Sequence, residues 1–578
     1  MKCVYRELLK YKKELVLIIF TVIGTTLCTL GLPSLLMRLI DKAIPEKNIP
    51  LVFEVGGIML LLVVIGVFCG IVTSHTSATV SMGVGRNLRS AIFQKVQYFS
   101  QTEIDKFSAS SLITRTNNDI TQVQTFLNQC LRIAVQAPIM CLCGIVLAIS
   151  SSPSLSGVLV VSIPLMAIVL IIIAKIAIPL STKIQLKIDR INLVMREKLT
   201  GVRVIRAFGT TEFESDKFDK INRDYQKTNK KMQRTTNSVL PVLTLILSFT
   251  AAMVMLMAAN QFVNKGVDYT IGEVMAIIQY IMQIMMAVIM LTLVFIMLPR
   301  AATAAARAQE VLETEPIIRN KEKTTDNPKL KGYLTFKNVS FTYPGAEFPA
   351  IKNLSFEAGP GETTAIIGGT GMGKSTVVNL IPRLYDVTEG QVLVDGVDVR
   401  DYDTEVLRDK IGFVPQKAVL FSGTIDSNIA FGDKNADEDR IEEAVKIAQS
   451  YDFIMKKEDG FRSPISQGGT NVSGGQRQRL AIARAIVRKP EVYVFDDSFS
   501  ALDFKTDKAL RTALAKETDN ATVVIVAQRI STIMDADRII VIEKGEVAGI
   551  GTHKELLQSC DVYKEIVSSQ MSKEDMDK

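Results

Sequence analysis

The residues best placed to do chemistry begin with a glycine-rich stretch, AIIGGTGMGKST, at positions 365–376. It fits the pattern G-x-x-x-x-G-K-[ST], and an apolar run typical of a strand precedes it at 363–367. Backbone N–H groups of such a loop wrap phosphates, and the N-terminus of the following helix adds partial positive charge. The stretch therefore predicts a nucleoside triphosphate site, formed by Gly368, Gly369, Thr370, Gly371, Met372, Gly373, Lys374, Ser375 and Thr376.

Within this stretch two side chains have distinct predicted roles. Lys374 would contact the β- and γ-phosphates, and the Ser375 hydroxyl would ligate Mg²⁺. A second apolar strand, VYVFD, ends in Asp496, whose carboxylate would hold the same ion directly or through water. Asp497 follows, at the position where a longer acid could reach a water beside the γ-phosphate.

A second candidate anion site lies in the stretch NVSGGQRQRLAIARAI. Here Ser473, Gly474, Gly475 and Gln476 stand just before an amphipathic helix. Glycine-rich backbone at a helix start favours a bound phosphate. One chain thus carries two phosphate-binding elements about a hundred residues apart.

The ordered set of motifs resembles the ATP-binding cassette family, and six spans in front of it resemble a half-size exporter of that family. The resemblance implies that Tyr343 stacks on adenine, that Gln416 senses Mg²⁺ beside the membrane domain, and that VSGGQ is the signature motif. It also implies that two nucleotide domains sandwich two ATP molecules. Each ATP would lie between the phosphate loop of one domain and the signature of the other.

Two positions depart from the family pattern, and both concern hydrolysis. The family has glutamate at Asp497 and histidine at Gln528. A carboxylate displaced by more than an ångström can lose about 10²-fold in rate, and an amide cannot relay a proton. We expect Asp497, Gln528 and Gln416 to form the catalytic set, and Ser375, Gln416 and Asp496 the metal set.

These departures predict a site that binds ATP and Mg²⁺ but turns ATP over slowly. The signature is close to intact, with Val472 where leucine is usual, so it can complete a competent site on another chain. This division resembles the degenerate-site subunit of heterodimeric bacterial multidrug exporters. The alternative is a slow homodimer in which Asp497 takes the catalytic role of the family's glutamate.

The part of the sequence that precedes the predicted nucleotide site is rich in apolar residues. Hydrophobic residues make up 48% of the 578 residues and the mean hydropathy is +0.23, which favours membrane spans. Five long runs lack any Asp, Glu, Lys or Arg, and the stretch SSPS breaks one of them into a hairpin. The six predicted spans are 15–37, 52–74, 130–150, 155–178, 236–262 and 274–298.

Lysine and arginine collect in two long segments, 86–132 and 175–234. The positive-inside rule places both segments and both chain ends in the cytoplasm. The resemblance implies a multi-pass protein of a bacterial cell membrane. The two segments are predicted to be helical extensions. Within them, FSQTEIDKFSASSLITRTNNDI and RAFGTTEFESDKF resemble the family's coupling segments.

We therefore expect an all-α membrane domain of six transmembrane helices with long cytoplasmic extensions, followed by an α/β P-loop nucleotide-binding domain. The predicted boundaries are 1–310 for the membrane domain, 311–331 for a linker, 332–570 for the nucleotide-binding domain and 571–578 for a tail. Seven cysteines without paired spacing predict small buried side chains rather than a disulfide framework.

The transported compound is not written in the sequence. The sixth span carries methionines at helical spacing, Met275, Met282, Met286, Met290 and Met297, which fall on one stripe of the helix. They form a candidate apolar substrate wall, with Met282, Met286 and Met290 as the expected pocket residues and ordinary helix packing or lipid contact as the alternative. The expected partners are a second half-transporter, the lipid bilayer and a hydrophobic small molecule.

A formal net charge of +7 gives no argument for nucleic acid, and the apolar runs exclude a soluble cassette ATPase. The favoured function is ATP-driven export of hydrophobic or amphipathic compounds. The alternatives are a slow homodimeric exporter of lipid or peptide, and an ATP-gated sensor or channel.

Overall fold

The computed structural model describes residues 1–265, 269–321, 324–326 and 329–570, so the predicted tail at 571–578 lies outside it. The chain forms two compact units. The first holds Met1–Gln97 and Ser110–Thr314, and the second holds Tyr98–Ala109 with the chain from Glu315 onward. The short segment Tyr98–Ala109 thus joins the second unit, although it lies in the sequence between long helices of the first.

The first unit is all helical, as predicted. Among the described residues, six helical stretches are long and apolar enough to cross a membrane: Lys2–Ala43, Ile49–Gln97, Ala109–Ser151, Pro153–Thr200, Thr211–Gln261 and Ile271–Glu313. Its main helices are α1 (Lys2–Leu8), α2 (Lys12–Arg38), α3 (Ile49–Gln97), α5 (Ala109–Thr114), α6 (Ile120–Ser151), α7 (Pro153–Ser156), α8 (Leu159–Thr200), α9 (Val202–Ala207), α10 (Thr211–Asn237), α11 (Val239–Lys265) and α12 (Ile271–Glu313).

The predicted hairpin between the third and fourth spans is confirmed. Helix α6 ends at Ser151, Ser152 is extended, and Pro153 starts the short α7. Proline suits the first position of a helix because its missing N–H would have no partner there. The chain can therefore reverse direction within a few residues and enter α8.

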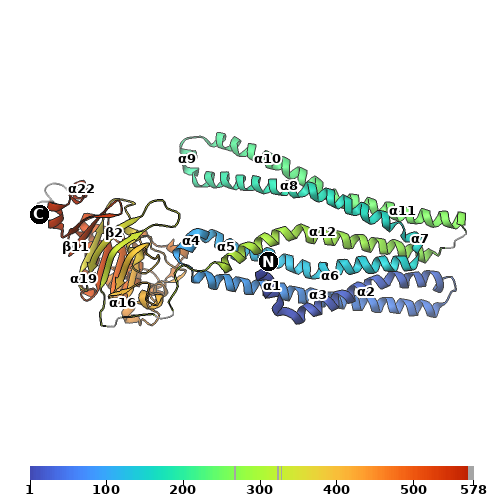
Figure 1. The fold of residues 1–578 in the computed structure, drawn as a ribbon, viewed down its shortest axis with the longest axis horizontal. Helices are drawn as coiled ribbons and strands as arrows, with labels where there is room; N and C mark the ends of the chain where they lie inside the picture. Colours follow the sequence, from blue (N-terminus) through green and yellow to red (C-terminus); the bar gives the residue numbers. More distant parts are fainter. Residues whose placement is uncertain (266–268, 322–323, 327–328, 571–578) are drawn as a thin grey trace. The chain divides into compact units, whose positions relative to one another are not determined.

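Helices α2, α3, α6 and α12 pack lengthwise on one another (Figure 1). Tyr280 of α12 is fully buried, and its hydroxyl lies 2.5 Å from that of Ser34 in α2. A Cβ at Gly144 of α6 would meet the Ile284 side chain at 2.9 Å, which marks a close approach to α12.

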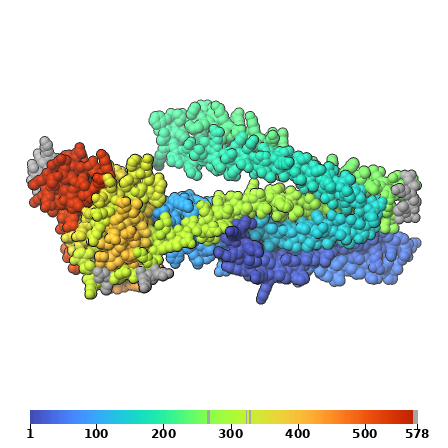
Figure 2. Space-filling view, in the orientation of Figure 1, coloured from blue at the N-terminus to red at the C-terminus, as the bar shows by residue number. Residues whose placement is uncertain are grey.

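Helices α8 and α10 form a long antiparallel hairpin joined by α9, and in the space-filling view they make one continuous ridge, cyan to green (Figures 1 and 2). No residue of α9 or α10 is buried.

The second unit contains two main sheets. Five strands of the six-stranded sheet, β11-β3-β10-β9-β6, run parallel, and β12 is antiparallel at its edge. A four-stranded antiparallel sheet, β2-β1-β4-β5, contributes to an apolar cluster that it shares with β3, β9, β10 and β11 of the six-stranded sheet. The strands are β1 (Leu334–Phe341), β2 (Ile351–Ala358), β3 (Thr363–Ile367), β4 (Glu389–Val394), β5 (Val397–Asp398), β6 (Ile411–Val414), β7 (Gly423–Thr424), β8 (Pro464–Ile465), β9 (Val492–Asp496), β10 (Thr522–Val526), β11 (Arg538–Glu543) and β12 (Glu546–Gly551).

The helices of this unit are α4 (Gln101–Phe107), α13 (Lys374–Leu380), α14 (Thr404–Asp409), α15 (Ile425–Ile429), α16 (Glu438–Ile447), α17 (Tyr451–Met455), α18 (Gly474–Ile486), α19 (Phe504–Glu517), α20 (Ile530–Ile533), α21 (His553–Ser559) and α22 (Asp561–Gln570). Strands β9 and β10 are buried along their whole length, as parallel strands covered on both faces are. Because β3, β9 and β10 are parallel neighbours, the residues that follow them meet at one edge of the sheet.

Candidate nucleotide site

A cavity of about 250 Å³ lies at this edge of the six-stranded sheet. Residues from the phosphate loop, the ends of β9 and β10, and two other loops line it. The lining residues are Tyr343, Ala350, Thr370, Gly371, Gly373, Lys374, Ser375, Thr376, Gln416, Asp496, Asp497, Val526 and Gln528. The structure thus gathers residues that are up to 185 positions apart, the span from Tyr343 to Gln528.

The phosphate loop depends on Gly373 for its shape. Gly373 has φ +92° and caps the N-terminus of α13. A Cβ there would lie 2.5 Å from the backbone oxygen of Ala350, which real Cβ atoms do not tolerate. The residue combines a left-handed backbone with a close approach, and glycine alone meets both demands at no steric cost.

Lys374 folds over the loop that it follows. Its ammonium donates to the carbonyl oxygens of Gly368 at 2.7 Å and Gly369 at 2.6 Å. Burial lowers the pKa of this lysine, while the charges of Asp497 and Asp496 oppose that shift. The amine is therefore held inside the loop as a cation available to phosphate oxygens.

Ser375 and Asp496 meet as the sequence predicts. The serine hydroxyl donates to Asp496 Oδ1 at 3.0 Å. Burial raises the pKa of Asp496, and the Ser375 bond works against that rise. A hydroxyl and a carboxylate beside a phosphate loop are hard oxygen ligands, so this pair fits a magnesium ion whose other ligands would be phosphates and water. Gln416, the third predicted ligand, lines the same cavity but bonds to Asp497.

Asp497 is held by two amides on one oxygen. Its Oδ2 accepts from Gln416 Nε2 at 3.2 Å and from Gln528 Nε2 at 2.9 Å. The residue has φ +47°, and its N–H donates to the carbonyl of Val526 in β10. Burial is the main cause that raises the pKa of this carboxyl. Asp497, Gln416 and Gln528 therefore come together as one hydrogen-bonded group.

Tyr343 also lines the cavity. Its hydroxyl is 3.0 Å from that of Thr376, and its ring stands edge-on to Tyr385 with centroids 5.4 Å apart. Tyr385 is 7% exposed and donates its hydroxyl proton to Asp105 Oδ2 of α4 at 2.9 Å. Burial raises the pKa of Tyr385, and the bond to Asp105 raises it further.

Sequence reasoning missed Tyr385 and Asp105 as a pair. A tyrosine after α13 carries no motif of its own, and the two residues are separated by 280 positions. One signal could have indicated Asp105: the segment that contains α4 resembles the family's coupling segments.

The signature residues lie elsewhere in the second unit. Ser473 caps α18 in a capping box with Gln476: the Gln476 N–H donates to the serine oxygen at 3.2 Å, and the Ser473 N–H donates to Gln476 Oε1 at 3.0 Å. A Cβ at Gly474 would meet no described atom within 4 Å. None of the four predicted signature residues, Ser473 to Gln476, is among the described residues that line the 250 Å³ cavity.

The comparisons with known proteins agree with this geometry. Residues 15–288 match the ABC transporter transmembrane region, and residues 351–500 match the ABC transporter family. An uncharacterized ABC transporter ATP-binding protein of Mycobacterium tuberculosis is 39% identical over 97% of this chain and 96% of its own length. The chain belongs to the ABC transporter family.

Other similar proteins refine the relation. An uncharacterized ABC transporter ATP-binding protein of Bacillus subtilis is 38% identical over 94% of each chain. An ATP-dependent lipid A-core flippase of Haemophilus influenzae is 31% identical over 94% of this chain and 92% of its own. The solved structure of a bacterial Atm1-family ABC exporter with ATP bound has a TM-score of 0.79, covers 97% of this chain and 99% of its own, and is 24% identical, so it shows the shared exporter fold.

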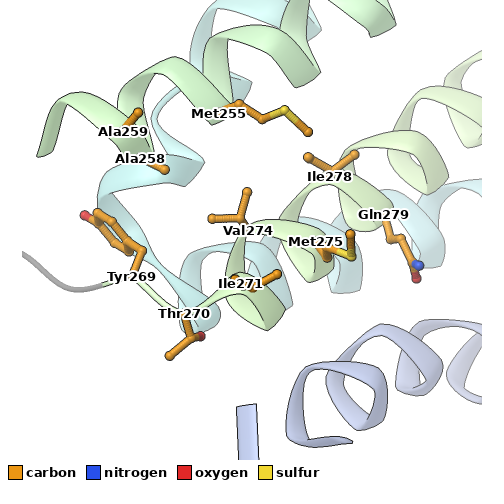
Figure 3. Close-up of a pocket in the computed structure, with 10 residues that line it drawn as sticks. All are labelled: Met255, Ala258, Ala259, Tyr269, Thr270, Ile271, Val274, Met275, Ile278 and Gln279. Carbon is orange, nitrogen blue, oxygen red and sulfur yellow. The ribbon is translucent and has the colours of Figure 1, made fainter. Parts of the chain in front are cut away.

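In the membrane unit of this ABC transporter, one cavity touches the predicted methionine stripe at a single described residue, Met275. The cavity has about 540 Å³ and lies between the facing ends of α11 and α12, where Met255 and Met275 point toward it (Figure 3). Met275 of the predicted stripe belongs to its described lining, whereas Met282, Met286 and Met290 do not. Met282 and Met286 are about half exposed in this chain, which is compatible with substrate contact and with lipid contact. The substrate wall therefore stays a prediction.

The shape of the phosphate loop leads to a paired test. Gly373→Ala should weaken ATP binding by more than about tenfold, because the new Cβ meets backbone and the left-handed φ adds strain. Gly371→Ala is the matched control, since Gly371 has φ +80° but open space around its Cβ position. Equilibrium binding of a fluorescent ATP analogue to the purified chain measures both. Equal affinities in the two variants would contradict the steric argument.

Proposed function

We propose that this chain is one half of an ATP-driven exporter of hydrophobic or amphipathic compounds, of multidrug type, and that it works with a different half-transporter. Its own site binds Mg-ATP and hydrolyses it slowly, while its signature motif completes the competent site of the partner. Both chain ends would face the cytoplasm. The observation that carries the proposal is the pair of hydrogen bonds that Asp497 accepts from the amides of Gln416 and Gln528.

The geometry of Asp497 supports slow hydrolysis for two reasons. Its side chain is one methylene shorter than glutamate, so its oxygens stay closer to the end of β9 than a catalytic carboxylate would. Both amide donors also converge on Oδ2, which leaves that oxygen engaged rather than aimed at a water. A general base has to reach the proton that it removes, and a reach deficit of this kind can cost about 10²-fold.

Gln528 is a second reason to expect slow hydrolysis. Its amide donates to Asp497 and can donate to a phosphate oxygen, but it can neither take up a proton nor carry a positive charge. The residues for binding are complete at the same site: the phosphate loop, Lys374, and the Ser375–Asp496 pair that would hold magnesium. When bound, the ion would offset phosphate charge. Binding and hydrolysis are thus separable in this chain.

Two features support a partner chain. The helix that starts at Ser473 has an open N-terminus outside the chain's own cavity, which is suited to the phosphates of a nucleotide held by another domain. The hairpin of α8 and α10 exposes every α10 residue at least in part and buries none of them. Such a surface is suited to contact with another subunit, and a partner with glutamate and histidine at the corresponding positions would supply the working site.

The contact between Tyr385 and Asp105 supports coupling of the nucleotide site to the membrane helices. Helix α4 begins with a capping box, and Glu103 also joins it to the rest of the second unit, because its Oε1 accepts from the Ile317 N–H at 3.2 Å. Because α4 sits in the chain directly after the long helix α3, a movement of α4 would be transmitted along that helix.

A second candidate is a slow homodimeric exporter of lipid. It is favoured by the lipid A-core flippases of Haemophilus influenzae and Pasteurella multocida, each 31% identical over at least 94% of this chain. Co-purification of untagged protein with the tagged chain, followed by mass spectrometry, separates the two. A different half-transporter in equal amount supports the heterodimer, and the chain alone supports the homodimer.

Restoring the missing groups tests the impaired site. The purified chain should bind ATP but hydrolyse it slowly, and Asp497→Glu with Gln528→His should raise kcat by at least about tenfold. Asp497→Asn is the control, since it keeps the size but removes the base. Steady-state phosphate release measures all three. A fast rate in the unchanged chain that survives Asp497→Asn would refute the impairment.

The signature motif predicts an effect at a distance. In the complex with its partner, Ser473→Ala should abolish turnover while ATP binding to this chain's own phosphate loop is kept, because the lost hydroxyl serves the other site. Ser569→Ala, an exposed serine of α22, is the control. Turnover equal to that of the unmodified complex would reject the shared-site arrangement.

Coupling predicts a split between ATP use and transport. Tyr385→Phe removes the bond to Asp105 and keeps the ring beside Tyr343, so ATP binding should be retained while substrate moved per ATP falls several-fold. Transport and hydrolysis are measured together in proteoliposomes that contain the complex. If the ratio stays constant, the contact does not contribute to coupling.

A further inference from the structure

The backbone around Gln528 is held by a residue from the far end of the described chain. Gln570, the last residue of α22, accepts from the Ile530 N–H at 2.9 Å through Oε1. Its Nε2 donates to the Gln528 carbonyl at 2.7 Å. One side-chain amide therefore bridges the two backbone groups on either side of Arg529.

This stretch of backbone has few other supports. The last sheet bond of its strand is made by Ala527, whose N–H donates to Ile366 at 3.2 Å. Helix α20 begins at Ile530, and its N-cap residue, Arg529, makes no side-chain cap. The first N–H groups of a helix need an acceptor from outside the helix, and Gln570 supplies one. The amide thus takes the place of the missing cap.

The position of Gln570 is fixed by packing. Tyr563 and Val567 of α22 are fully buried in the apolar cluster that also contains Ile530 and Ile533 of α20. Gln570 lies three residues after Val567, so it falls on the same face of the helix. The core contact sets the helix, and the helix brings the amide to the segment 528–530.

We infer that Gln570 is a positioning residue for the nucleotide site: its amide fixes the Gln528–Ile530 backbone, so that the side chain at position 528 is directed at Asp497 and the γ-phosphate. Gln570 itself lines none of the described part of the cavity and acts through Gln528. The effect on hydrolysis rests on the proposed function, whereas the effect on the backbone does not. Neither bond depends on which side chain occupies position 528, because both partners are main-chain atoms.

Hydrogen–deuterium exchange of the full-length purified chain tests the backbone part. Gln570→Ala should speed exchange in a peptide covering 528–533 by about fivefold, the effect of losing one ordinary hydrogen bond. Exchange in the phosphate-loop helix and the melting temperature should stay as in the unmodified chain. Ser569→Ala is the matched control, because its hydroxyl donates to the Ile566 carbonyl of its own helix. Equal exchange in the two variants overturns the inference, and so does faster exchange across the whole second unit with a lower melting temperature.

Kinetics test the consequence in the Asp497→Glu, Gln528→His background. There Gln570→Ala should lower kcat several-fold and leave KM for ATP unchanged, since Gln570 does not touch the nucleotide. An unchanged kcat in an active background overturns the inference. If that background has no turnover, the failure belongs to the proposed function, and the exchange result still decides the role of Gln570.

Discussion

The reach of a carboxylate from the end of β9 is the constraint on which the proposed function of this chain depends. A parallel sheet delivers the phosphate loop, Asp496 and Asp497 to one edge with little freedom, because β3, β9 and β10 are paired and buried. Once the strands are fixed, only the length of the side chain decides how far its oxygens extend. Aspartate reaches Gln416 and Gln528, and it forms a closed hydrogen-bonded group with them.

In the proposed function, that hydrogen-bonded group is the reason why the site would keep binding ATP and hydrolyse it slowly. Phosphate binding uses backbone N–H groups, the lysine and the serine, none of which depends on Asp497. Hydrolysis depends on the placement of the attacking water, where a displacement of about 1 Å can cost about 10²-fold in rate. An exporter with two composite sites can carry such a loss in one of them, provided that the signature remains able to serve the other.

The supports of the site come from distant parts of the chain. Asp105 in α4 contacts the tyrosine that packs against Tyr343, and Gln570 in α22 contacts the backbone of Gln528. Both contacts are single side chains held in place by buried neighbours, Phe107 in α4 and Val567 in α22. The nucleotide cavity is therefore linked through α4 to the sequence that leads into the membrane helices, and through α22 to the C-terminal helix.

The sequence by itself determined the membrane unit, the phosphate loop and the identity of the two departures, because charge-free runs and fixed motif spacings are local properties of the chain. Six apolar helices and the strand at 363–367 follow the predicted pattern. Only the tertiary structure decided that Gln416 and Gln528 share one oxygen of Asp497, that α4 joins the second unit, and that Gln570 holds the segment 528–530. These contacts join residues between 31 and 280 positions apart and carry no periodicity or motif, so they exist only once the sheet and its core have brought the segments together.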